Sequence, residues 1–126
     1  MKFGVQRIDF MGQIHDKSLQ FAVRSVNFYK YLCETKREHI IGRQYLRCST
    51  SIGAIVRESK NAQSDADFIN KLSIALKEAD ETQYWLEVLH LSEIINNEEF
   101  ESMNNDVKEL IAILTKIIKT KKEKVI

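Results

Sequence analysis

The sequence predicts an all-α protein that folds as one antiparallel four-helix bundle with up-down-up-down topology. The chain has 126 residues and is 44% hydrophobic, which suits one domain with one core. It contains no proline and four glycines, so long segments lack the residues that interrupt helices. Apolar residues recur every three or four positions in four segments joined by short polar connections, and a bundle is the simplest way to bury four such stripes.

The first helix is expected to follow an N-terminal arm. Residues 1–15 have no clear apolar period and are assigned to this arm, whereas residues 16–124 are assigned to the bundle domain. Asp16 suits the N-cap position of a helix that runs to about Thr35. The stripe expected to face the core comprises Leu19, Ala22, Val23, Val26, Tyr29 and Cys33.

The second helix is predicted from Ile41 to Ser59. Its apolar stripe comprises Ile41, Tyr45, Cys48, Ile52, Ile55 and Val56. Small and hydroxyl-bearing residues weaken its middle, and they are expected to bond back to helix carbonyls or to allow close packing. These residues are Gly42, Ser49, Thr50, Ser51 and Gly53.

Cap signals mark the last two helices. Ser64, followed by Asp67, resembles a capping box and starts a helix that runs to about Ile94, and Asn96 suits the cap of the fourth helix. The third helix is expected to bury Phe68, Ile69, Leu72, Ala75, Leu76, Ala79, Gln83, Leu86 and His90. The fourth is expected to bury Phe100, Met103, Val107, Leu110, Ile111, Leu114, Ile117 and Ile118.

The first and third helices carry more apolar surface than one core requires. Phe21, Phe28 and Leu32 lie nearly opposite the inward stripe of the first helix, at 100° per residue. The corresponding residues of the third helix are Ile74, Trp85 and Val88, flanked by Glu78 and Glu81. This second apolar face predicts self-association, and the alternative is that the N-terminal arm covers one of the stripes.

Positive charge gathers on the second helix. Residues 36–60 contain six Lys or Arg and two acidic residues, whereas residues 61–95 contain two Lys and seven acidic residues. On a straight helix these cations project within about 80° of one another, away from the apolar stripe; they are Lys36, Arg43, Arg47 and Arg57. One interpretation of this basic ridge is a phosphate-binding stripe for RNA. The other is that its arginines pair with Glu78 and Glu81 across a subunit contact.

No catalytic or metal-binding pattern stands out, so the chain is not expected to be an enzyme or to need a cofactor. His15, His39 and His90 are far apart and lack metal-ligand spacing, and the ExxH motif of di-iron bundles is missing. The serines of the second helix have no glycine-rich elbow or neighbouring base. His90 is expected to be a packed or half-exposed histidine.

Cysteine usage and hydropathy favour a cytoplasmic protein. Cys33 and Cys48 lie in helical segments without CxxC spacing, which is typical of small buried side chains in a reducing compartment. No run approaches the roughly 18 apolar residues that cross a bilayer, so no membrane partner is expected.

Residues 46–89 carry a family resemblance. The stretch LRCSTSIGAIVRESKNAQSDADFINKLSIALKEADETQYWLEVL resembles the bacterial four-helix-bundle proteins related to those encoded in intervening sequences of large-subunit (23S) ribosomal RNA genes. The match runs through the second and third helices and is weaker elsewhere. Ile55 departs from the family, which usually has asparagine at this place in an SIxxNIxE pattern, so any polar role of that asparagine is lost.

The resemblance implies a homopentameric ring of four-helix bundles without established enzymatic activity. The chain is also similar to the accessory protein of diversity-generating retroelements, a basic pentamer that engages a reverse transcriptase and nucleic acid. The formal net charge of +1 weakens this second analogy. The expected partners are therefore other copies of the chain and, in one interpretation, RNA or a nucleic-acid-processing protein.

Overall fold

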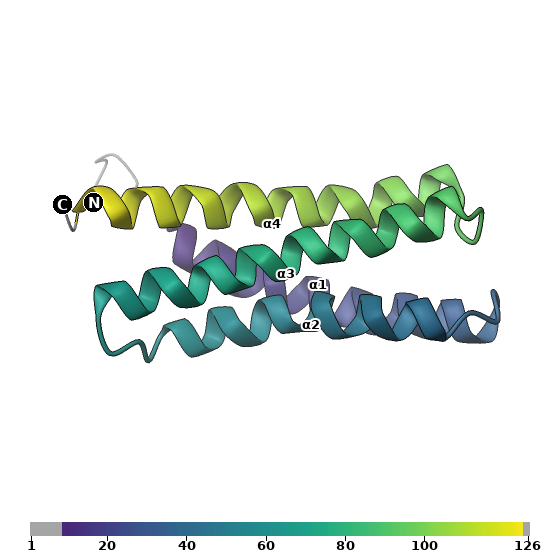
Figure 1. The fold of residues 1–126 in the computed structure, drawn as a ribbon, viewed down its shortest axis with the longest axis horizontal. Helices are drawn as coiled ribbons and strands as arrows, with labels where there is room; N and C mark the ends of the chain where they lie inside the picture. The colour runs from purple at the N-terminus through teal and green to yellow at the C-terminus, as the bar shows by residue number, and fades with distance from the viewer. Residues whose placement is uncertain (1–8, 125–126) are drawn as a thin grey trace, which may run out of the picture.

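Four long helices pack in sequence into an up-down bundle. The computed structural model describes residues 9–124, and the helices are α1 (Phe10–Glu34), α2 (Ile40–Ser59), α3 (Asp65–Leu91) and α4 (Asn97–Lys124). Each helix packs antiparallel against the next, and α4 returns alongside α1 (Figure 1). The predicted all-α class and topology are confirmed. Residues 1–8, which make up half of the predicted N-terminal arm, lie outside the described residues.

The first helix begins seven residues earlier than expected. The carboxylate of Asp9, not that of Asp16, caps α1 by accepting a hydrogen bond from the Gly12 backbone N–H at 2.9 Å. Ile14, which the sequence placed in the arm, is completely buried. Residues 10–15 are therefore part of the bundle, and their two turns were too short to reveal an apolar period.

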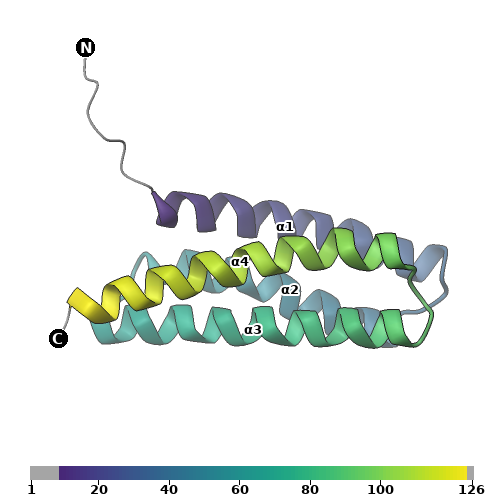
Figure 2. The same ribbon diagram turned by 90° about the horizontal axis from the view of Figure 1, so that it is seen from above.

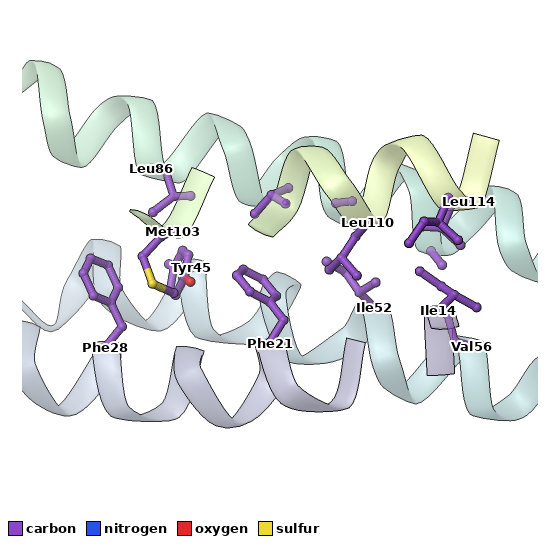
Figure 3. Packing of buried hydrophobic residues seen from close by; sticks show 14 of the residues in the cluster. Ile14, Phe21, Phe28, Tyr45, Ile52, Val56, Leu86, Met103, Leu110 and Leu114 are labelled. Carbon is purple, nitrogen blue, oxygen red and sulfur yellow. The ribbon is translucent and has the colours of Figure 1, made fainter. Parts of the chain in front are cut away.

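The face of α1 that points into the core is the opposite of the predicted one. Phe21, Phe28 and Leu32, expected at an oligomer interface, belong to the core with 2%, 9% and 0% exposure. Figure 3 shows Phe21 and Phe28 pointing from α1 into the core. The core stripe also carries two buried serines, Ser18 and Ser25, which diluted its hydrophobicity in the sequence.

The two serines fit the core for different reasons. Ser25 lies beside a buried hydroxyl, and Ser18 lies where α1 and α2 approach each other closely. The Ser25 hydroxyl lies 2.9 Å from the hydroxyl of Tyr45, the largest fully buried side chain. Ser18 lies beside Gly53, where an added Cβ would approach the Ser18 carbonyl oxygen to 3.2 Å. The large side chains of Phe21 and Phe28, each three residues after a serine, supply the apolar volume.

The other three helices turn the expected stripes inward, with some predicted residues, such as Phe68, Ile69 and Ile111, only half-buried. Leu72, Ala75, Ala79 and Leu86 of α3 are fully buried, and Val107 and Leu114 of α4 face them across the core. The polar middle of α2 behaves as predicted, because its hydroxyls donate to carbonyls one turn earlier. These residues are Ser49, Thr50 and Ser51.

The starts of α3 and α4 predicted from cap residues are confirmed, whereas the Asp16 cap predicted for α1 is wrong. The Ser64 hydroxyl accepts from the Asp67 backbone N–H at 3.0 Å. Asn96 and Glu99 form a reciprocal box, in which each side chain accepts from the other residue's backbone N–H at 2.8 Å. Seen from above, the loop before α4 and the loop between α1 and α2 lie at the same end of the bundle (Figure 2).

Candidate functional site

The outer face of α2 and the flanking faces of α1 and α3 contain most of the residues singled out by the sequence. Arg43, Arg47 and Arg57 are all exposed on α2. Lys36 lies in the loop before α2, with its ammonium 5.7 Å from the centroid of the Tyr31 ring. The helix therefore places the three arginines on one outward side, as predicted, but their surroundings differ.

Arg47 is paired with acidic residues of α3 in the same chain. Its guanidinium bonds to the Glu81 carboxylate and lies 3.7 Å from the Glu78 carboxylate. Glu81 also accepts a hydrogen bond of 3.1 Å from the indole N–H of Trp85. The predicted partners of Arg47 are correct, but the prediction that they lie across a subunit contact is wrong for this arginine.

Arg43 and Arg57 have no acidic partner among residues 9–124. Neither residue forms a salt bridge within residues 9–124. The Arg57 guanidinium instead lies 3.5 Å from Nε2 of His15 on α1. Two of the three α2 arginines thus keep most of their capacity to bind an external anion.

Two outer surfaces of the bundle expose large apolar side chains. The α1 outer surface consists of Leu19, Val23 and Val26, with 49%, 56% and 38% exposure. Their spacing of four and three residues forms a continuous stripe, whereas the sequence had placed these residues in the core. Sequence reasoning found the two stripes of α1 and exchanged their roles.

The α3 outer surface consists of Ile74, Tyr84, Trp85 and Val88. Ile74 and Tyr84 have 41% and 55% exposure, while Trp85 and Val88 are half-buried. The rings of Tyr84 and Trp85 meet edge to face, with centroids 5.0 Å apart. Three of these residues were predicted from the sequence. Tyr84 was missed, although its position three residues before the exposed Glu87 places it on the same outward side.

A small cavity opens between α1 and α2. Its volume is about 160 Å³, and its walls include Leu19 and Ala22 of α1 and Thr50, Gly53 and Ala54 of α2. His15 and Arg57 complete its lining. The cavity therefore combines apolar walls with a cationic side chain.

The buried titratable groups are suited to packing and not to nucleophilic chemistry. Burial raises the pKa of the Cys48 thiol from 9.0 to about 11, which disfavours the reactive thiolate. Burial also raises the pKa of Tyr45. His90 is half-exposed, as predicted, and stacks on Phe100 with ring centroids 4.5 Å apart.

The described part of the chain has neither a metal-binding cluster nor a membrane-spanning helix. Residues 9–124 contain no cluster of three or more histidine, cysteine, aspartate or glutamate side chains placed to hold a metal ion. None of the four helices combines the length and the apolar character required to span a bilayer.

Comparison with known proteins assigns a family. The family model of the 23S rRNA-intervening sequence protein matches residues 12–116. The chain belongs to this family. Its resemblance to intervening-sequence proteins, inferred from residues 46–89, is thus confirmed over nearly the whole bundle.

A solved structure agrees with this assignment. A crystal structure from Bacteroides thetaiotaomicron, described as a protein of unknown function from the S23 ribosomal protein family, is 55% identical to the chain. The match has a TM-score of 0.86 and covers 87% of this chain and 98% of the other. No curated protein sequence matches the chain. Membership of the intervening-sequence family therefore establishes kinship and fold, and leaves the molecular role to be argued from the surface.

Proposed function

We propose that the chain is a non-enzymatic cytoplasmic protein that assembles into a homo-oligomeric ring, in which the α1 outer surface of one copy contacts the α3 outer surface of the next. The observation that carries this proposal is the presence of two exposed apolar stripes on a bundle whose core is already filled. Burying such stripes between copies removes apolar area from water, which is the main driving force for association.

The two surfaces favour a closed ring over a symmetric pair. Helices α1 and α3 pack against α2 and α4 but not against each other, so the two surfaces lie at opposite corners of the bundle and contact between them repeats from copy to copy. A heterologous contact closes when the rotation between copies completes a circle. The family resemblance supports five copies.

Native mass in solution tests the proposal directly. We expect light scattering after size-exclusion chromatography to give a pentamer at two protein concentrations. Val23→Lys on α1 and Ile74→Lys on α3 should each lower the native mass, because each places a charge in an apolar contact. Asn105→Lys, at an exposed position of α4, is the matched control and should leave the mass unchanged. A monomeric native chain would contradict the proposal.

RNA binding is the second candidate function, and the unpaired arginines favour it. Arg43 and Arg57 are exposed, aligned on α2 and free of carboxylate partners within residues 9–124, and Lys36 lies beyond the start of the same helix. Arg47 contributes less, because Glu78 and Glu81 already neutralise it. Guanidinium groups suit phosphate oxygens, so a structured RNA is the partner that this ridge fits.

Salt dependence separates RNA binding from self-association. If phosphate contacts dominate, affinity for a structured RNA should fall steeply as salt rises, and Arg43→Glu should weaken binding without lowering the native mass. Lys108→Glu, at an exposed position of α4, is the control. Binding that is undetectable or insensitive to salt would exclude this candidate and leave an oligomeric scaffold or adaptor.

A further inference from the structure

We propose that the Tyr84 side chain of one copy inserts into the cavity between α1 and α2 of a neighbouring copy, and that acidic residues beside Tyr84 pair with Arg57 at that cavity. This inference rests on the proposed self-association and specifies its contact.

Tyr84 has the properties of an inserted side chain. It is a large aromatic residue with 55% exposure, and its hydroxyl has no hydrogen-bond partner within residues 9–124. Contact with the edge of the Trp85 ring limits its freedom before any partner arrives. A pre-oriented aromatic side chain loses little entropy on burial, and such residues frequently dominate interfaces.

The cavity has the size and lining to receive an aromatic ring. Its volume is about 160 Å³, and a protein cavity of roughly 150 Å³ holds a benzene molecule. Leu19 and Ala22 supply apolar walls, and Gly53 belongs to the lining at the point where α1 and α2 approach closely. The phenol ring would therefore replace water against apolar atoms, while Thr50 offers a hydroxyl in the same lining.

Charges beside the two features are complementary. Asp80 and Glu87 lie one helical turn before and after Tyr84, and both are exposed without a salt bridge in the described part of the chain. Arg57 lines the cavity and forms no salt bridge with an acidic residue that the structure describes. Seating Tyr84 in the cavity brings one of these carboxylates within reach of Arg57 whichever way the neighbouring α3 runs, because the carboxylates lie on both sides of the ring.

This charge complementarity selects a second copy of the chain as the occupant. The basic side of the contact lies on α2 and the acidic side on α3, so every copy carries both halves on separate helices. The contact also extends the α1 outer surface, since Leu19 belongs to both that surface and the cavity.

Charge exchange in the full chain tests the contact. Tyr84→Ala should weaken self-association at least about tenfold, as expected for an interface anchor. Arg57→Glu alone, and Asp80→Lys with Glu87→Lys alone, should each lower the native mass, and the chain that combines all three substitutions should recover it. Glu101→Lys, at an exposed α4 position that forms no salt bridge within residues 9–124, is the control for charge reversal. Circular dichroism of each variant checks that the bundle is folded.

The outcomes distinguish this inference from the proposed function. Recovery of the native mass in the combined variant supports the contact. An assembled native chain whose mass is unaffected by Tyr84→Ala and by both charge reversals overturns the contact and leaves self-association standing. A native chain that is monomeric overturns both.

Discussion

At the scale of single residues, the pair formed by Ser25 and Tyr45 ties a polar group into the core. Their hydroxyls lie 2.9 Å apart, and both residues are fully buried. Tyr45→Phe leaves Ser25 without this partner, so we expect a loss of about 1–2 kcal/mol in the free energy of unfolding, measured by urea denaturation. Ser25→Ala should act similarly. The double variant should lose less than the sum of the single losses, and strict additivity would show that the two hydroxyls do not interact.

The Cys48 thiol makes stability depend on alkaline pH. Its pKa rises from 9.0 to about 11 on burial, so between these pH values the unfolded chain loses a proton that the folded chain retains. The contribution is fully present below about pH 9 and is lost as pH rises toward 11, at up to about 1.4 kcal/mol per pH unit.

Denaturation at a series of pH values measures this effect. Buried Tyr45, whose pKa is also raised, adds to the same loss at higher pH. Cys48→Ala should flatten the fall in unfolding free energy between pH 9 and pH 11, although it lowers stability at neutral pH by removing a buried group. Cys33→Ala keeps the Cys48 thiol and serves as the control. Equal slopes in the native chain and in Cys48→Ala would contradict the assignment.

At the scale of helices, the capping box of α4 has a measurable role. Asn96→Ala removes the side-chain acceptor of the Glu99 backbone N–H, which should lower the free energy of unfolding by about 1 kcal/mol. Asn105→Ala makes the same substitution at an exposed position inside the same helix. There, alanine has the higher helix propensity, so this control should be neutral or slightly stabilising.

The contact between α1 and α2 depends on the small residue at its centre. Gly53→Val introduces a side chain whose Cβ meets the Ser18 carbonyl at 3.2 Å, and the larger branched group must push the helices apart. We expect a destabilisation of about 1–3 kcal/mol by urea denaturation. Ala54→Val, one residue later at an exposed position, is the matched control and should change stability by much less. Similar losses at both positions would mean that the β-branch, and not the helix contact, is responsible.

The starts of α3 and α4 and three of the four core stripes could be predicted because they depend on local chemistry. Cap residues such as Ser64 and Asn96 act within one turn, and the inward stripe of α4 is the only apolar stripe that helix has. Local chemistry could not identify which face of α1 points into the core, since both of its stripes are apolar. The choice depends on what α2 and α4 present to it, including the hydroxyl of Tyr45 and the space left by Gly53.

At the scale of the whole molecule, the sequence predicted excess apolar surface correctly and located only half of it. On α3 the predicted Ile74 is exposed, whereas the predicted Trp85 is half-buried and packs against the core. On α1, the stripe predicted to face the core is exposed, and the stripe predicted to be exposed faces the core. For the arginines too, only part of the arrangement could be predicted. Helix geometry places them on one side of α2. The pairing of Arg47 with Glu81 could not be predicted, because it depends on how α3 lies against α2.

The two ends of the described chain lie close together at one end of the bundle. Asp9, which caps α1, and Lys124, the last residue of α4, line the same surface cavity. A short Gly/Ser linker can therefore join them, and the chain can be opened instead in the loop between α1 and α2, at the far end of the bundle. Such a circular permutant should keep the four-helix core, with its new N- and C-termini at the opposite end of the bundle. A fluorescent tag can then be attached at either end of the bundle, by choosing the native chain or the permutant.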